Sequence, residues 1–196
     1  MALSFINELQ SSVPEYAQGA SRIKQINKVI SDISRKKESY LHIKKLLKNM
    51  VQKDASDMDF GGPRTKQKVW YRVYGDKAPD PEMPSYTNDE AAAMVLCILS
   101  DDQKNMLLKN KNLDFALSVK VDETETPFRF RGNIFFERNS LAVNFRLIKQ
   151  KLFKMDELQI PDPIVKRLDL RHEKSGLFLV TGITGSGKSA TLDTII

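Results

Sequence analysis

The eight residues from Gly182 to Ser189 (GITGSGKS) constrain this chain most, because they match the phosphate-binding pattern G-x-x-x-x-G-K-[S/T]. An apolar run from Leu177 to Thr181 precedes them and is typical of a buried parallel strand. The segment from Ala190 to Ile196 has the composition of the first turns of a helix. A strand, a glycine-rich loop and a helix in this order predict a nucleotide-binding site. The alternative is a glycine-rich turn that ends a strand beside an exposed lysine.

The residues of this loop suit the chemistry of phosphate binding. Its glycines have no Cβ, so the backbone can curl and present N–H groups to phosphate oxygens. The positive N-terminal end of the following helix favours the same anion. Lys188 is the candidate catalytic residue, and the Ser189 hydroxyl is the candidate Mg²⁺ ligand. The predicted site for ATP and Mg²⁺ comprises Gly182, Thr184, Gly185, Ser186, Gly187, Lys188, Ser189 and Ala190.

Hydrolysis also needs an acid that holds the metal and a residue that orients the attacking water. Seven residues follow Ser189, and Asp193 is the sole acid among them. We therefore expect the chain to be part of a longer ATPase. By itself, it should bind nucleotide poorly and hydrolyse none.

The composition limits the class of protein. Hydrophobic residues make up 41% of the chain, enough for an ordinary core. No apolar run reaches the roughly 20 residues of a membrane span, and the first residues do not resemble a signal peptide. The single cysteine, Cys97, lies in an apolar run, which predicts a buried, inert thiol and favours a reducing cytoplasm. His42 and His172 have no neighbouring metal-ligand pattern.

The net charge of +6 is concentrated near the N-terminus. Between Ser21 and Lys53 there are ten Lys or Arg residues and two acids, with isoleucines and leucines at roughly helical spacing. Such a basic amphipathic helix can contact a membrane surface peripherally. The alternative is a basic face on a helix that packs against its own protein. Tyr40 is the sole aromatic residue here, so we expect no nucleic-acid partner.

The segment from Ala55 to Lys149 has the pattern of a small α/β domain. Strand formers, a capping box at Thr87 and Glu90, and a run of prolines mark its elements. We expect Ala55 to Ile148 to close its own core and to fold alone. The predicted elements are a strand at Lys68–Tyr74, a proline-rich loop, helices at Asp89–Leu99 and Asp101–Leu108, and strands at Phe115–Val121, Phe128–Glu137 and Leu141–Ile148.

Several spaced motifs together resemble one family. They include Ala55-Ser56-Asp57, Arg72-Val73-Tyr74-Gly75-Asp76, Leu113-Asp114-Phe115-Ala116, Arg129-Phe130-Arg131, Phe145-Arg146-Leu147-Ile148, Met155-Asp156-Glu157-Leu158 and the glycine-rich loop. In this order and spacing, they are similar to the type IV pilus retraction (twitching-motility) ATPases, within the type II/IV secretion ATPases. The resemblance covers roughly residues 45 to 196.

The resemblance implies a fold and an assembly. The fold class is α/β, with a PAS-like N-terminal domain followed by the truncated start of a RecA-like P-loop ATPase domain. Family members form homohexamers, bind ATP between the two domains and act on pilins at an inner-membrane platform protein. The implied location is the cytoplasm, with a peripheral position at the inner membrane face as the alternative. The predicted segments are a basic helical extension at 1–50, the PAS-like domain at 51–149, and the linker with the start of the ATPase domain at 150–196.

The chain departs from the family pattern at a few positions. Ile183 and Lys149 replace prolines, and Ala190 replaces a threonine. None of these changes removes a phosphate donor, because the loop backbone, Lys188 and Ser189 are intact.

Three arginines on the last two predicted strands form a second group of candidates. Arg129 and Arg131 share one strand face, and Arg146 lies on the partner strand. In the family, arginines of this domain reach the nucleotide phosphates, where guanidinium groups suit oxyanions. The alternative is a solvated face with salt bridges to Glu137 or Asp114.

Three functions remain open from the sequence. The first is a motor ATPase for type IV pilus retraction, and the second is a type II secretion or pilus-extension ATPase. The third is a non-catalytic module that binds nucleotide or another protein.

Overall fold

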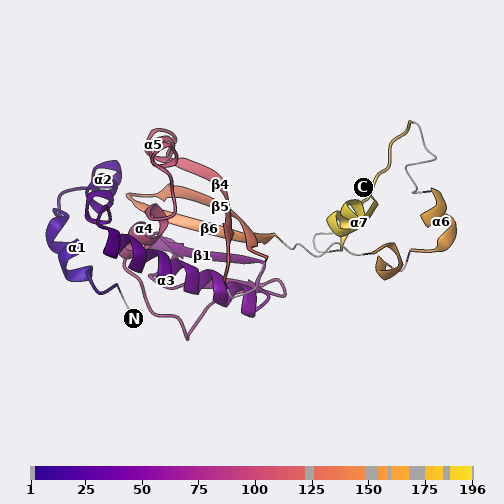
Figure 1. The fold of residues 1–196 in the computed structure, drawn as a ribbon, viewed down its shortest axis with the longest axis horizontal. Coiled ribbons are helices and arrows are strands. Elements are labelled where there is room, and N and C mark those ends of the chain that lie inside the picture. The colour runs from indigo at the N-terminus through magenta and orange to yellow at the C-terminus, as the bar shows by residue number, and fades with distance from the viewer. Residues whose placement is uncertain are drawn as a thin grey trace. The chain divides into compact units, whose positions relative to one another are not determined.

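The computed structural model describes residues 3–121, 126–148, 154–158, 160–167, 175–182 and 186–195. The chain divides into two compact units, Met1–Ile148 and Lys149–Ile196, which we describe separately (Figure 1). The first unit contains helices α1 (Ile6–Ser12), α2 (Gly19–Val29), α3 (Ile33–Gln52), α4 (Asn88–Leu96) and α5 (Asp101–Asn110), the 3₁₀ turn η1 (Pro63–Thr65), and strands β1 (Asp57–Gly61), β2 (Trp70–Val73), β3 (Asp76–Pro79), β4 (Asn112–Val119), β5 (Phe128–Glu137) and β6 (Ser140–Ile148).

The six strands form one antiparallel sheet in the order β3-β2-β1-β6-β5-β4. Each half is a meander of sequential strands, and the two halves meet where β1 pairs with β6, for example at Met58 opposite Phe145. One face of the sheet is apolar: Phe60, Phe130 and Phe145 are fully buried there. Gly132 lies on this face too. A side chain at this position would clash with the core, because a Cβ would come within 2.4 Å of the Phe115 ring. The core therefore lies on one side of the sheet.

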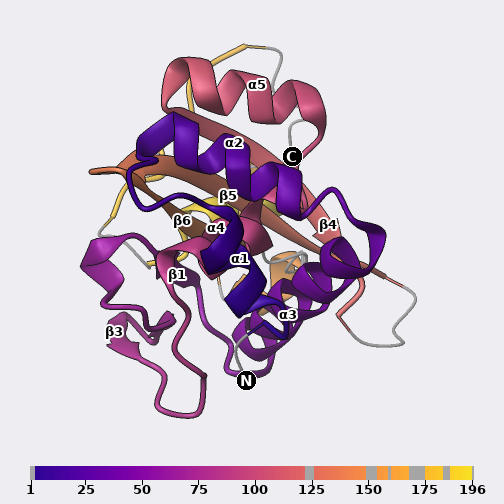
Figure 2. The ribbon, with the colours of Figure 1, turned by 90° about the vertical axis from the view of Figure 1, so that its left-hand side faces the viewer.

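Helix α4 covers the apolar face of the sheet and is buried on all sides. Ala91, Ala92, Ala93, Met94, Val95 and Leu96 are each at most 1% exposed. The helix contacts β1 and β6 on one side and α1, α2 and α3 on the other. Helices α1 to α3 thus form a second layer beyond α4, as Figure 2 shows from their side.

The basic helix predicted from Ser21 to Lys53 is two helices, α2 and α3. The break occurs at Asp32, whose carboxylate accepts hydrogen bonds from the N–H groups of Ser34 and Arg35 and so caps α3. Ile23, Ile26 and Ile30 of the first segment are buried in the common core, as are Leu46, Leu47 and Met50 of the second. The apolar stripe therefore packs against the rest of the protein, while Ile33 and Leu41 stay exposed.

The shared core leads us to expect that Ala55 to Ile148 does not fold alone, contrary to the sequence prediction. Leu9, Ile26 and Leu46 are fully buried members of the same cluster as the sheet residues. Without them, the outer side of α4 would face water. The described residues 3–52 thus contribute to this core, although their composition differs from that of the following segment.

Most elements predicted for this segment are confirmed. The strand Phe128–Glu137 has the predicted bounds, the two helices and the other three strands differ by one to three residues at most ends, and Thr87 and Glu90 form the predicted capping box. Strands β1 and β3 were not predicted. β1 carries acids at alternate positions, and β3 ends at Pro79, which an edge strand accepts because it has no partner on one side. Cys97 is buried as predicted, and burial raises the pKa of its thiol to about 12.

A buried carboxylate, Asp80, joins α3 to the loop after β3. Its side chain accepts hydrogen bonds from Asn49 Nδ2 at 2.7 Å and from the Glu82 N–H at 3.0 Å, and Lys53 Nζ lies 3.2 Å away. Burial acts to raise the pKa of Asp80, but these hydrogen bonds and the Lys53 charge together lower it below its ordinary value. Asp80 is therefore a charged contact between two segments that are far apart in the sequence.

The described part of the second unit contains η2 (Met155–Leu158), α6 (Asp162–Arg167) and α7 (Lys188–Ile195), and α7 contacts η2. The prediction of a buried strand at Leu177–Thr181 is wrong for this structure. These residues are not in a strand, and Leu177 and Leu179 are 81% and 76% exposed. A parallel strand needs hydrogen-bonded neighbouring strands, and the described residues of this unit include no strand with which this run could pair. None of the helices in the described ranges is long and apolar enough to cross a bilayer.

Replacing Asp80 by asparagine should destabilise the first unit by about 1–2 kcal/mol, because a charge-assisted contact is lost and two amide donors are brought together. The native pKa of Asp80 lies below the unfolded value, so its contribution is present at neutral pH. It should be lost as the pH falls from about 3.9 through the native pKa. Chemical denaturation at pH 7 and near pH 3 measures both effects. Glu82→Gln, at a side chain that is 74% exposed, is the matched control and should change little.

A chain of residues 1–148 should unfold cooperatively, whereas residues 55–148 should not. Each buried large apolar side chain contributes about 1.5–3 kcal/mol to the free energy of unfolding. The buried side chains of α1 to α3 together contribute more than the roughly 5–15 kcal/mol that is the typical total stability of a protein. Circular dichroism during heating compares the two. A cooperative transition of 55–148 at the temperature of 1–148 would show that the outer helices are dispensable.

Candidate nucleotide site

Gly182, at the start of the glycine-rich loop, lies close to two residues further along the motif. A Cβ placed on Gly182 would lie 2.6 Å from Ser186 Oγ and 3.9 Å from Lys188 Cγ. The side chains that follow the loop therefore lie against the backbone that precedes it. Gly187 has a φ of +86°, in the left-handed region that favours glycine. Gly187 therefore suits its position, and the roles of both glycines in phosphate binding stay predictions.

Helix α7 begins at Lys188, directly after the loop, and this confirms the predicted helix. The hydroxyl groups of Thr191 and Thr194 donate to the carbonyls of Gly187 and Ala190, at 3.1 and 2.7 Å. These bonds use the hydroxyls within the helix. The positive N-terminal end of the helix favours an anion beside its first turn.

The structure brings together Gly182, Ser186, Gly187 and Lys188 among the predicted ligands. Lys188 and Ala190 are partly buried at the start of α7. Thr184, Gly185 and the side chain of Ser189 lie outside what the structure describes, as does Ile183. The role of Ser189 as a metal ligand stays a prediction.

The three candidate arginines belong to the first unit, on the sheet face opposite α4. Arg131 lies directly opposite Arg146, and Arg129 lies opposite Ile148. Along the same row of the sheet, Arg146 lies opposite Asp57, Asp57 opposite Arg72, and Arg72 opposite Lys77. Four cations and one acid therefore form a row across five strands, from Arg131 to Lys77, and we call it the arginine row. Like charges directly opposite each other are destabilising, so Asp57 offsets the repulsion at the centre.

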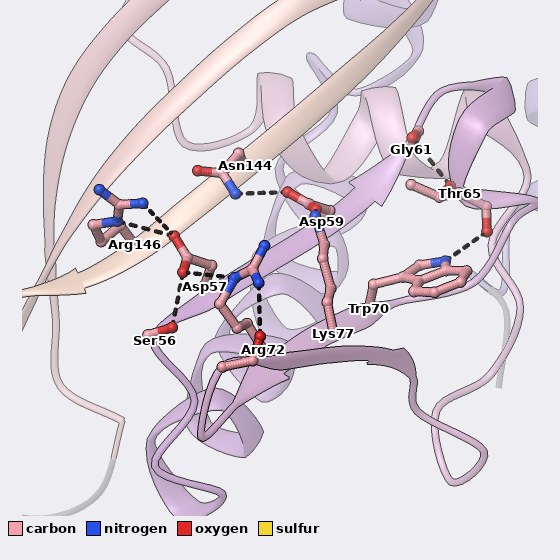
Figure 3. A network of polar contacts seen from close by, with 11 residues as sticks. Ser56, Asp57, Asp59, Gly61, Thr65, Trp70, Arg72, Lys77, Asn144 and Arg146 are labelled. Carbon is pink, nitrogen blue, oxygen red and sulfur yellow. Dashed lines mark hydrogen bonds and ion pairs between the residues drawn. The ribbon is translucent and has the colours of Figure 1, made fainter. Parts of the chain in front are cut away.

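Asp57 is the centre of this row and is only 6% exposed (Figure 3). Arg146 Nε and one of its terminal nitrogens each lie 2.9 Å from Asp57 Oδ1, and Arg72 Nε lies 3.4 Å from Oδ2. The Ser56 hydroxyl also donates to Oδ2 at 2.8 Å. Both carboxylate oxygens are thus satisfied, and Arg146 is held by a buried charge.

The other two arginines, Arg129 and Arg131, are exposed to solvent. Arg131 lies 3.5 Å from Asp114, and both side chains are more than half exposed. This is one of the salt bridges that the sequence offered as the alternative to nucleotide binding. Arg129 is exposed on the same face. Contact between any of the three arginines and nucleotide stays a prediction.

A pocket of about 350 Å³ opens on the same sheet face, between η1 and the β5–β6 hairpin. Asn144 Nδ2 donates to Asp59 at its edge, and Lys77 forms an ion pair with Asp59 (Figure 3). Its lining includes Asp59, Arg64, Trp70, Phe135, Glu137 and Asn144. Its volume is at the lower end for ligand sites. Sequence reasoning did not find it, because its residues come from η1 and five strands that no single motif joins.

The comparison with protein families identifies the family of this chain. A family model described as "Type II/IV secretion system protein" matches residues 16–196, which include the sheet, the arginine row and the glycine-rich loop. The chain belongs to the type II/IV secretion system protein family. This confirms the predicted resemblance to secretion and pilus ATPases.

Relatives of this type II/IV secretion family protein include pilus motors. The type IV pilus ATPase PilU of Pseudomonas aeruginosa is 31% identical over 157 residues, which are 80% of this chain and 38% of that protein. A twitching motility protein of Neisseria gonorrhoeae is 33% identical over 125 residues, 64% of this chain and 31% of that protein. The chain thus spans less than half the length of the relatives it matches.

A solved motor confirms the fold class of this family member. The crystal structure of the pilus retraction motor PilT with bound ADP matches with a TM-score of 0.62 and 29% identity, over 78% of this chain and 41% of that chain. The predicted order, an α/β N-terminal domain followed by the start of an ATPase domain, is therefore correct.

Replacing Asp57 by alanine should destabilise this secretion-family chain by about 2 kcal/mol, because Arg72 and Arg146 would lose the buried charge between them. Arg146→Ala combined with Asp57→Ala should cost less than the sum of the single changes, by about 1 kcal/mol. Urea denaturation of the four proteins gives this coupling. Arg131→Ala, which removes an exposed ion pair, is the control and should cost under about 0.5 kcal/mol. Additive costs for Asp57 and Arg146 would contradict the central role of this pair.

Proposed function

We propose that this chain is the nucleotide-binding part of a motor ATPase that powers type IV pilus retraction, and hence twitching motility. The observation that carries the proposal is the approach of Gly182 to Ser186 and Lys188 at the start of α7, next to the left-handed Gly187. Membership of the secretion family and the similarity to a retraction motor solved with ADP support a nucleotide as the ligand.

The residues of the loop fit ATP and Mg²⁺. The space beside Gly182 is too small for a Cβ, and the left-handed Gly187 turns the backbone immediately before α7. Backbone N–H groups of the loop and the first turn of α7 would hold phosphate oxygens, and Lys188 would neutralise their charge. The Ser189 hydroxyl would bind Mg²⁺, which supplies further neutralisation of the phosphates when bound. Each role belongs to a residue type with the required donor.

The proposal includes an assembly and a location. In it, the complete ATPase is a homohexamer that works in the cytoplasm against an inner-membrane platform protein of the pilus. Family membership and the pilus functions of the relatives support this part. Acids and other catalytic groups for hydrolysis would come from the part of the ATPase that this chain does not include.

In the complete ATPase, Lys188→Ala should lower ATP turnover by roughly a hundredfold or more, because a positive charge at the transferred phosphate is lost. Phosphate release with ATP and Mg²⁺ measures the effect. The control is Lys68→Ala, at an exposed lysine of the first unit, which should leave turnover unchanged. Both variants should keep the thermal stability of the first unit. Unchanged turnover in Lys188→Ala would contradict the assignment of the loop.

Deleting the gene should distinguish retraction from pilus extension or type II secretion. If the motor retracts pili, cells without it should carry surface pili but should not spread by twitching. Restoring the gene should restore twitching, and the Lys188→Ala version should not. Electron microscopy of the surface and a twitching-zone assay provide both readouts. Cells without pili, or with a secretion defect alone, would favour the alternative motors.

A further inference from the structure

Helix α3 presents to solvent a face that carries cations and large apolar side chains together. With about 100° between successive residues, its exposed positions cover roughly half of the helix surface. The lysines of this face are Lys37, Lys44 and Lys45, of which Lys44 is half-buried, and the apolar residues are Ile33, Tyr40 and Leu41. We call these six residues the α3 outer face.

The acids near α3 lie at its ends, except for Glu38, which lies on the helix beside Lys45. At the N-terminal end, Arg35 pairs with Glu8, and at the C-terminal end Lys53 pairs with Asp80 and Glu82. Glu38, the one acid of the helix, accepts hydrogen bonds from the N–H and hydroxyl groups of Ser4. In the ranges that the structure describes, no carboxylate forms an ion pair with the lysines of the α3 outer face. Apart from Glu38, the charged side chains in the middle of the helix are lysines, so this part of α3 carries a net positive charge.

The apolar members of the face are exposed in spite of a large core that could have buried them. Ile33 is 84% exposed, Leu41 54% and Tyr40 38%. Single exposed apolar residues are common, but these three lie among lysines on the same side of one helix. The opposite side is fixed by buried Ile43, Leu46 and Met50, so the helix cannot rotate to bury them.

We propose that the α3 outer face binds an anionic bilayer surface. Lysines at such a surface are attracted by acidic headgroups, and interleaved aliphatic and aromatic side chains enter the boundary between headgroups and acyl chains. A nucleic acid or an acidic protein would match the lysines but would leave Ile33 and Leu41 without an apolar environment. Charge and apolar content together therefore favour lipid. This goes beyond the proposed motor function, since it needs neither nucleotide nor pilus.

The proposal is tested by flotation of the whole 196-residue chain with vesicles of phosphatidylglycerol and phosphatidylcholine, against vesicles of phosphatidylcholine alone. The chain should float with the anionic vesicles at low salt and should be released by about 0.5 M salt, where the screening length falls well below 10 Å. Each lysine near a charged surface changes the partition by about fivefold. Lys37→Gln, Lys44→Gln and Lys45→Gln together should therefore weaken binding by roughly a hundredfold.

Matched controls separate this face from the net charge of the protein. Lys68→Gln, Lys109→Gln and Lys120→Gln remove the same charge from exposed sites on other elements and should leave binding largely intact. Leu41→Ser should weaken binding several-fold without changing its dependence on salt. Thermal melts show that each variant is folded.

Three results would overturn the proposal. They are the absence of flotation with anionic vesicles at low salt, equal losses in the two lysine triplets, and binding to double-stranded DNA or an acidic polypeptide but not to vesicles. ATP turnover by the complete motor is measured separately, so failure here and failure of the motor assignment are distinguishable.

Discussion

A helix that is apolar on every side must be covered on every side, and α4 is such a helix. Its alanines let the sheet approach closely from one direction, while Met94 and Leu96 need apolar neighbours in the core. The sheet covers only one side, so α1, α2 and α3 cover the other. The position of the N-terminal helices is thus a consequence of the composition of a helix about 60 residues later in the sequence. Arg22 adds a bidentate pair with Asp89 at the start of α4, with nitrogen–oxygen distances of 2.8 and 2.6 Å.

The two faces of the sheet differ in what they offer to other molecules. The face toward α4 is filled by aromatic and aliphatic side chains, and the opposite face carries the arginine row, Asp57 and a small pocket. Charges on the open face satisfy one another locally, with Asp57 between two arginines and Asp59 between Asn144 and Lys77. This separation places all buried apolar area on one side, so the chemistry of the open face can vary without changes in the core.

The sequence predicted those parts of the structure whose signal is local. The capping box at Thr87 and Glu90, the β5–β6 hairpin and the turn of α7 after the glycine-rich loop each depend on neighbouring residues, and each is present. The sequence did not predict β1, whose acids lie opposite residues of β2 and β6 that are distant along the chain. The break at Asp32 was missed because the helical spacing of isoleucines continues across it, although Asp is a strong N-cap.

For the candidate site, the motif predicted which residues bind phosphate, but it could not predict which distant residues contact the candidate arginines. The close approach of Gly182 to Ser186 is local and follows from the spacing of the glycines. The buried partner of Arg146 is Asp57, which is 89 residues away, so hairpin geometry alone could not reveal it. The run at Leu177–Thr181 has the composition of a strand, but strand formation depends on neighbouring strands and not on the run itself.

The pairing of β1 with β6 also determines when this domain can become complete during synthesis. β1 ends at Gly61 and β6 begins at Ser140, so the centre of the sheet joins two stretches of chain that leave the ribosome far apart in time. The β1–β3 meander and the β4–β6 meander can each form from nearby residues. Until β6 has emerged, however, one edge of β1 has no strand to pair with. Phe60 of β1 also lacks the ring of Phe145, on which it stacks in the folded domain. A nascent chain of this protein therefore carries an exposed, pairing-competent strand from the synthesis of β1 until β6 has been made and has paired with it.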